Sequence, residues 1–235
     1  MVDLPDVLDL TAPQARVLGC LIEKQLTTPD AYPLTLKALT AACNQTTNRD
    51  PVVQYDPQLV ETTTLALKGK GLARVVHPGS GERATRYRQV ADEALGLDPA
   101  ERGLLCLLLV RGAQTVAELR TRSERLHPFS SPSEVEAVLE RMATGERPLV
   151  AKVERQPGQK EHRWIQLLEV DAERRAAWTP NSSVAASSRG GRVEELEVRV
   201  EQLERRLVQL ESALDGLIEL PEPELPDTQD DATSA

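Results

Sequence analysis

Six basic side chains occur within one short stretch of the sequence, and their chemistry suits contacts with phosphate groups. Two lysines end a helical stretch and four arginines flank a Pro-Gly turn, the set being Lys68, Lys70, Arg74, Arg83, Arg86 and Arg88. Ammonium and guanidinium groups bind phosphate oxygens through charge-assisted hydrogen bonds. A basic cluster is as often a solvated surface, so these residues indicate DNA contacts only if the elements around them form a nucleic-acid-binding fold.

No other residues point to catalysis or to a bound metal. The histidines lie far apart in the sequence, with no cysteine beside them, at His77, His127 and His162. The cysteines form no CxxC pair and are Cys20, Cys43 and Cys106. We therefore expect a protein that is not an enzyme, that has no cofactor and no metal site, and whose cysteines are small buried hydrophobes.

The elements around the basic residues follow the order of a winged helix. Helical periodicity, with a proline near the start of each segment, marks residues 11–24, 34–43 and 57–70. Two β-rich stretches separated by a Pro-Gly-Ser-Gly turn follow, at residues 72–77 and 85–89. Three helices and a hairpin predict a winged-helix domain over residues 11–90, after an N-terminal extension of residues 1–10.

The same order returns about 80 residues later, as expected for an internal repeat. The matching segments are residues 16–22 with 102–108, 35–39 with 115–119, 73–75 with 151–153, and Arg86-Tyr87 with Arg163-Trp164. A third helix over 132–143 completes a second winged-helix domain, residues 91–178. The predicted fold class is therefore mainly α with small β-hairpins, an α+β protein of two tandem winged-helix domains.

The two predicted domains differ in charge. Residues 11–90 hold ten Lys or Arg against six Asp or Glu, a balance of +4 within a chain whose net charge is −9. In the second domain the third helix carries Glu134, Glu136 and Glu140, whereas the hairpin again has cations, at Arg155, Lys160 and Arg163. Because acidic helices repel phosphates, any DNA contact should concentrate in the first domain.

A polar segment between the second and third helices of the first domain is longer than the tight turn expected there. It contains Asn44, Gln45, Asn48, Arg49, Asp50 and Pro51. On this stretch, and on Gly71-Leu72 after it, the chain resembles the bacterial YceH family of uncharacterised winged-helix proteins, from about residue 10 to residue 168. The resemblance implies a tandem winged-helix fold and little about activity. The segment is either a further contact or, as we favour, a hydrogen-bonded brace.

The last part of the chain is predicted to form a dimer. After a Ser/Ala/Gly-rich linker, residues 179–191, an unbroken heptad seam consists of Val193, Leu196, Val200, Leu203, Leu207, Leu210, Leu214 and Leu217. Arginine fills the g positions and glutamate the e positions, which predicts a parallel homodimeric coiled coil over residues 192–219. A single amphipathic helix that folds back on the second domain is the alternative.

The remaining composition places the protein in the cytoplasm, without a membrane partner. Residues 220–235 form an acidic tail, no apolar run approaches the roughly 20 residues of a membrane span, and the N-terminal residues are acidic. The expected function is DNA binding by a dimer, which suits a role in transcriptional regulation. The alternative is a protein-interaction scaffold that uses the winged-helix surfaces to bind an unknown protein partner and binds no nucleic acid.

Overall fold

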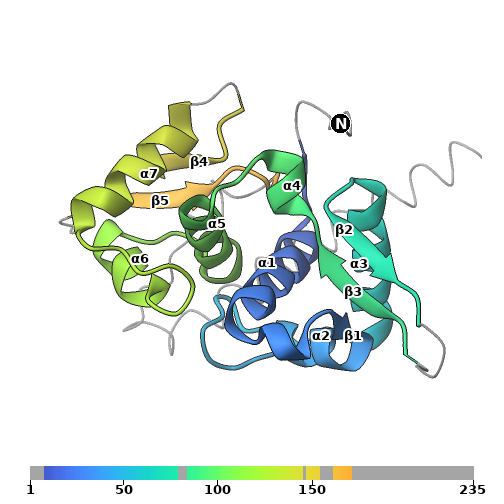
Figure 1. Ribbon diagram of the computed structural model, residues 1–235. Helices are drawn as coiled ribbons and strands as arrows, with labels where there is room; N and C mark the ends of the chain where they lie inside the picture. Colours follow the sequence, from blue (N-terminus) through green and yellow to red (C-terminus); the bar gives the residue numbers. More distant parts are fainter. Residues whose placement is uncertain (1–7, 79–83, 145–146, 154–160, 171–235) are drawn as a thin grey trace, which may run out of the picture. The chain divides into compact units, whose positions relative to one another are not determined.

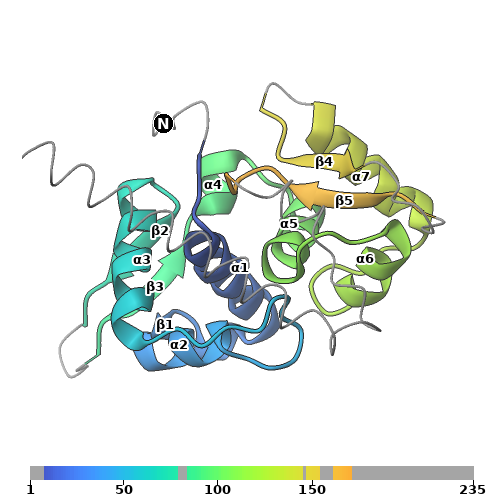
Figure 2. The same cartoon turned by 180° about the vertical axis from the view of Figure 1, so that it is seen from behind.

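The computed structural model describes residues 8–78, 84–144, 147–153 and 161–170, in which helices and two small antiparallel sheets alternate (Figures 1 and 2). The first copy of the repeated order consists of α1 (Ala12–Thr27), the short 3-10 helix η1 (Pro29–Ala31), β1 (Leu34–Thr35), α2 (Leu36–Cys43), α3 (Pro57–Gly69), β2 (Ala73–Val76) and β3 (Arg86–Gln89). The second copy consists of α5 (Pro99–Arg111), α6 (Val116–Ser123), α7 (Pro132–Thr144), β4 (Val150–Val153) and β5 (Arg163–Gln166). A short helix, α4 (Ala91–Leu95), joins the two copies.

Side-chain caps fix where the helices begin, and they recur in both copies. The side chain of Thr11 accepts a hydrogen bond from the backbone N–H of Gln14, whose side chain accepts one from the Thr11 N–H; Asp98 and Glu101 form the same capping box on α5. The side chain of Thr35 caps α2, so that helix begins two residues later than the predicted segment 34–43.

The predicted hairpin of the first copy is part of a three-stranded sheet with the strand order β1-β3-β2. Leu34 and Thr35 pair antiparallel with Tyr87 and Arg86. A two-residue strand leaves no periodic signal in the sequence, and these residues were expected to be helical. The coarse fold class, mainly helical with small antiparallel hairpins, is confirmed.

The two copies pack against each other through α1 and α5. A Cβ atom added to Gly19 on α1 would lie 2.7 Å from Cγ1 of Val110 and 2.9 Å from Cβ of Leu109, both on α5. The thiol of Cys106 donates to the Gly19 carbonyl oxygen at 3.4 Å. The absent side chain at Gly19 therefore lets the helices approach closely, and contacts group Met1–Thr179 into one unit.

Most of the buried side chains in the core of this unit are aliphatic, and Tyr87, Phe129 and Trp164 are buried among them. The cysteines Cys20, Cys43 and Cys106 are buried free thiols, which confirms the expectation for them. None of the helices in the described part of the chain is long and apolar enough to cross a lipid bilayer. The predicted linker, coiled coil with its eight seam residues, and acidic tail lie outside the described residues, and the domain boundary at residue 90 stays a prediction.

Candidate nucleic-acid interface

Three of the six basic residues share one face of the first hairpin. Along β3 the side chains alternate, with Tyr87 and Gln89 buried and with Arg86 and Arg88 on the other face. Arg74 on β2 lies directly opposite Arg88. Arg74, Arg86 and Arg88 therefore form what we call the arginine face, on the side of the sheet that points away from the core.

The three arginines differ in what holds them. Arg86 donates to the carbonyl oxygen of Pro33 at 3.0 Å, so its guanidinium ties β3 to the segment before β1. Arg74 and Arg88 both approach the carboxylate of Glu93, at 3.8 and 3.3 Å, and remain 59% and 36% exposed. Like charges opposite each other across a strand pair are unfavourable, and Glu93 offsets this repulsion. Arg74 and Arg88 are the two that can reach a ligand.

The structure does not bring the lysines to this face. Lys70 donates to the carbonyl oxygens of Leu8 and Asp9, at 2.8 and 3.4 Å, and thus anchors the start of the described chain. Lys68 is exposed on α3, and α3 packs on the opposite face of the hairpin, where Tyr87 donates to Glu61 at 3.2 Å (Figures 1 and 2). Arg83 lies outside the described residues. The six basic residues are therefore not one site.

The solvent face of α3 is neutral and partly apolar. Gln58 and Thr62 are exposed polar residues, while Leu59 is 37% and Leu65 47% exposed. Val52, which precedes the helix, is 52% exposed. A cation-poor helix with exposed leucines resembles a surface for a partner at least as much as one for phosphates.

The corresponding face of the second hairpin lacks these cations. The two hairpins can be superimposed by their strand pairs, because Arg86 pairs with Val76 in the first and Arg163 pairs with Val153 in the second. In this superposition Ala151 takes the place of Arg74, and Ile165 takes the place of Arg88. Residues 73–75 thus correspond to residues 150–152, whereas the sequence suggested a match with residues 151–153, one residue further along. The error arose because Ala-Arg-Val and Ala-Lys-Val look alike, whereas strand pairing fixes which side chains share a face.

Lys152 therefore lies on the inner face of the second hairpin, with Trp164. Its ammonium group is 5.5 Å from the Trp164 ring centroid and 3.4 and 3.6 Å from the carboxylates of Glu136 and Glu140 on α7. Those two carboxylates are about half exposed. The third helix of the second copy thus keeps the acidic surface that its sequence indicates.

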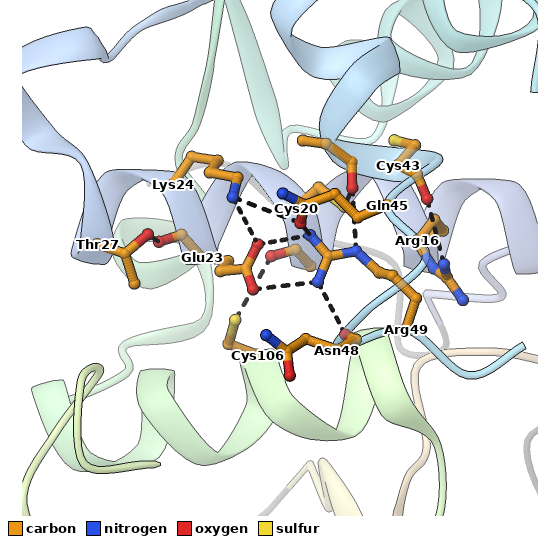
Figure 3. A network of polar contacts seen from close by, with 12 residues as sticks. Arg16, Cys20, Glu23, Lys24, Thr27, Cys43, Gln45, Asn48, Arg49 and Cys106 are labelled. Atoms are coloured by element: carbon orange, nitrogen blue, oxygen red, sulfur yellow. Dashed lines mark hydrogen bonds and ion pairs between the residues drawn. The ribbon is translucent and has the colours of Figure 1, made fainter. Parts of the chain in front are cut away.

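The polar segment of the first copy is a hydrogen-bonded brace centred on the buried side chain of Arg49 (Figure 3). The Arg49 guanidinium donates to both carboxylate oxygens of Glu23, at 3.1 and 2.5 Å, and to Gln45 at 2.6 Å. Its Nε atom donates to the Ala42 carbonyl oxygen at 3.0 Å. Burial alone would raise the pKa of Glu23, but the Arg49 guanidinium holds that pKa below its ordinary value.

A second buried cation completes the brace. Arg16 donates to the carbonyl oxygens of Cys43 and Pro51, at 3.3 and 2.6 Å. The amide of Asn44 forms two 2.8 Å hydrogen bonds with the backbone of Tyr55. The sequence did not single out Arg16 or Glu23. The available signal was a charged residue at each end of an apolar helical stretch.

The brace also contacts the second copy. The backbone N–H of Asp50 donates to the Val110 carbonyl oxygen at 3.0 Å, and the Arg111 guanidinium donates to the side-chain oxygen of Asn48. The segment therefore fastens α5 to the first copy. Within the described ranges, no three His, Cys, Asp or Glu side chains are placed to hold a metal.

Two copies of one helix-and-hairpin order, joined through α1, α5 and a buried arginine brace, define a duplicated α+β protein. The family model described as "Protein of unknown function, DUF480" matches residues 10–159, and the chain belongs to this family.

Curated relatives carry the name UPF0502 protein. That of Geobacter sulfurreducens is 44% identical over 189 residues, 79% of this chain and 85% of the relative. UPF0502 protein YceH of Escherichia fergusonii is 42% identical over 194 residues, 80% and 90% of the two chains. That of Pseudomonas savastanoi pv. phaseolicola is 46% identical over 201 residues, 83% and 88%. The resemblance to the YceH family is thereby confirmed.

Proposed function

We propose that this chain is a non-enzymatic tandem winged-helix protein that binds double-stranded DNA through the arginine face of its first hairpin. The observation that supports the proposal is the adjacent pair Arg74 and Arg88, which are exposed and half-buried, respectively, and which, among the described residues, form ion pairs with Glu93. The second copy places Ala151 and Ile165 at the same positions, so the hairpin itself does not require the two cations.

Arg86 has a different role in this proposal. It donates to Pro33 as its counterpart Arg163 donates to Ala113, at 3.0 and 2.9 Å, so both copies use this arginine to hold the hairpin. Phosphates would contact Arg74 and Arg88 and take the place of Glu93 as their counter-charge. Such binding is largely independent of base sequence and falls steeply with salt.

The proposal includes dimerisation through the heptad seam of residues 192–219. A parallel pair would join two arginine faces through the linkers and raise the affinity for one duplex by increasing the effective concentration. Light scattering should show a dimer for the full chain and a monomer for a chain that ends before Arg192. A truncated chain that stays dimeric would overturn this assignment.

The proposal places the protein in the cytoplasm, because its buried, unpaired thiols fit a reducing compartment.

A salt titration of binding to a random duplex tests the DNA proposal. Each phosphate contact contributes about 0.9 to the slope of log affinity against log salt. The R74Q/R88Q double variant should therefore bind more weakly, with a slope smaller by about two units. R141Q, which removes one exposed cation on α7, is the control and should leave the slope unchanged. No binding at about 50 mM salt, or equal slopes for all three proteins, would refute the proposal.

The solvent face of α3 supports a second candidate function, docking of a protein partner. Leu59 and Leu65 on this helix and Val52 before it are exposed large apolar residues, whereas the described solvent face of α3 has a single cation, Lys68. This face and the arginine face lie on opposite sides of the first sheet, so both functions can coexist. If the duplex assay fails, partner docking through α3 becomes the favoured function.

A further inference from the structure

Three arginines gather at the turn between α5 and α6 of the second copy. Arg163 donates to the Ala113 carbonyl oxygen in this turn at 2.9 Å, and Arg122 donates to the Gln114 side chain at 2.8 Å. Arg111 is the last residue of α5. All three are half-buried, with 29% and 32% of the Arg163 and Arg122 side chains exposed.

The carboxylates around this turn do not balance its positive charge. One carboxylate, Glu118, serves both Arg122 and Arg163, at 3.2 and 3.7 Å. Arg111 approaches the brace, where Glu23 is already paired with Arg49 and Lys24. Even with the exposed Asp50 of the brace included, the described residues here hold five cations, Lys24, Arg49, Arg111, Arg122 and Arg163, against three carboxylates.

The first copy has no cation at the positions that correspond to Arg111 and Arg122. Aligned by helix position, Arg111 corresponds to Gln25, since Arg16 matches Arg102 in the repeat. Arg122 corresponds to Ala42, since Thr35 and Thr115 both cap the following helix. The first copy has a neutral amide and a methyl group at these places, and it joins α1 to α2 by a longer connection that contains η1 (Pro29–Ala31). Only Arg163 has a basic counterpart, Arg86.

Burial without a full counter-charge favours an anion at this turn. Desolvation, together with repulsion from Arg122 and Arg49, lowers the pKa of Arg111. An arriving anion would offset both effects. Guanidinium groups suit the oxygens of a phosphate, because each presents a planar fork of N–H donors.

We propose that Arg111 and Arg122 form a phosphate-binding site at the α5–α6 turn. Arg163 and Gln114 hold the turn beneath it, and Asn48 orients Arg111 from the brace. The ligand is a phosphate group, either on a small molecule or in a nucleic-acid backbone. The site is independent of the arginine face, because it belongs to the second copy.

Calorimetric titration of the full chain with inorganic pyrophosphate and with a short random duplex tests the site. R122Q and, separately, R111Q should weaken binding of at least one ligand about tenfold, the loss expected for one charge-assisted contact. R125Q removes an exposed cation just beyond the end of α6 and is the matched control, expected to change binding less than twofold. Circular dichroism checks that each variant is folded.

The two ligands distinguish the source of the phosphate. A selective loss of pyrophosphate binding assigns the site to a phosphorylated small molecule, and a selective loss of duplex binding assigns it to the nucleic-acid backbone. The proposal is overturned if R111Q and R122Q bind both ligands as the wild type does, or if R125Q weakens binding equally. R74Q/R88Q should leave pyrophosphate binding unchanged, so failure of the DNA proposal is separable from failure of this one.

Discussion

The first and second copies share a framework and differ in the charges that they place on it. On the arginine face of the first copy, Arg74 and Arg88 have Ala151 and Ile165 as their counterparts in the second copy. Conversely, Arg111 and Arg122 at the α5–α6 turn correspond to the neutral residues Gln25 and Ala42 in the first copy. A duplicated chain thus contains its own control, because the features present in both copies serve the architecture.

The repeated contacts identify that architecture. Gln89 and Gln166 each end a hairpin and accept backbone N–H donors that follow, Ala91 at 2.6 Å and Leu168 at 2.8 Å. Arg86 and Arg163 donate to equivalent carbonyl oxygens. Charged residues without such a counterpart are the ones to test for function.

The largest difference between the copies is the brace, and removing its central cation should have the largest effect. R49A leaves the Glu23 carboxylate, only 14% exposed, without its bidentate partner. Loss of one partner from a buried ion pair typically costs about 3–5 kcal/mol. Urea unfolding should show a decrease of this size in the free energy of unfolding.

The loop between α6 and α7 in the second copy provides the control for R49A. Arg125 in that loop is exposed, so R125A should change the free energy of unfolding by less than about 0.5 kcal/mol. A loss below about 1 kcal/mol for R49A would mean that the polar segment does not brace the unit.

Acid should weaken the same ion pair. Because Arg49 depresses the pKa of Glu23, this carboxylate contributes stability above its unfolded pKa of about 4.3, and the contribution disappears as the pH falls through the lower folded value. E23Q removes this dependence. The difference in unfolding free energy between wild type and E23Q should be largest near neutral pH and shrink below about pH 4. A constant difference across this range would contradict the assignment.

The contact between α1 and α5 should respond to one methyl group. Gly19 on α1 faces α5. The residue of α5 that corresponds to Gly19 in the repeat is the buried Leu105. G19A places a Cβ atom 2.7 Å from Val110 and should cost about 1–3 kcal/mol through overpacking.

Gly69, at the end of α3, has nothing within 4 Å of an added Cβ atom, so G69A is the control and should be neutral or stabilising by up to about 1 kcal/mol. Equal effects of the two changes in thermal or urea unfolding would show that α1 and α5 are not tightly packed.

Local signals in the sequence predicted the helices and hairpins well. Proline and capping residues mark helix starts, and the predicted segment 57–70 became α3 (Pro57–Gly69) with Asp56 as its cap. Short elements were missed, namely β1 and α4, because two to five residues show no periodicity. The match of β2 with β4 was wrong by one residue because Ala-Arg-Val and Ala-Lys-Val look alike.

The candidate site was harder to predict, because its contacts are distant in sequence. Lys70 and Arg86 were expected to face phosphates, yet each donates to carbonyl oxygens more than 50 residues away. Arg49 was named for its family motif, but its partner Glu23 lies 26 residues before it. Composition gives the charge of a segment, while tertiary packing decides which side chains remain available.

The smallest expected effect concerns the arginine that both copies retain. Arg86 and Arg163 each donate one hydrogen bond to a carbonyl oxygen and are half-buried, so R86Q and R163Q should each lower the free energy of unfolding by about 1 kcal/mol. Because Arg163 also lies 3.7 Å from Glu118, R163Q should cost slightly more. R86Q should affect DNA binding less than R88Q, its neighbour on the same face, if Arg86 is structural. The reverse order in the salt titration would make Arg86 a phosphate contact and remove the distinction between repeated and unrepeated arginines.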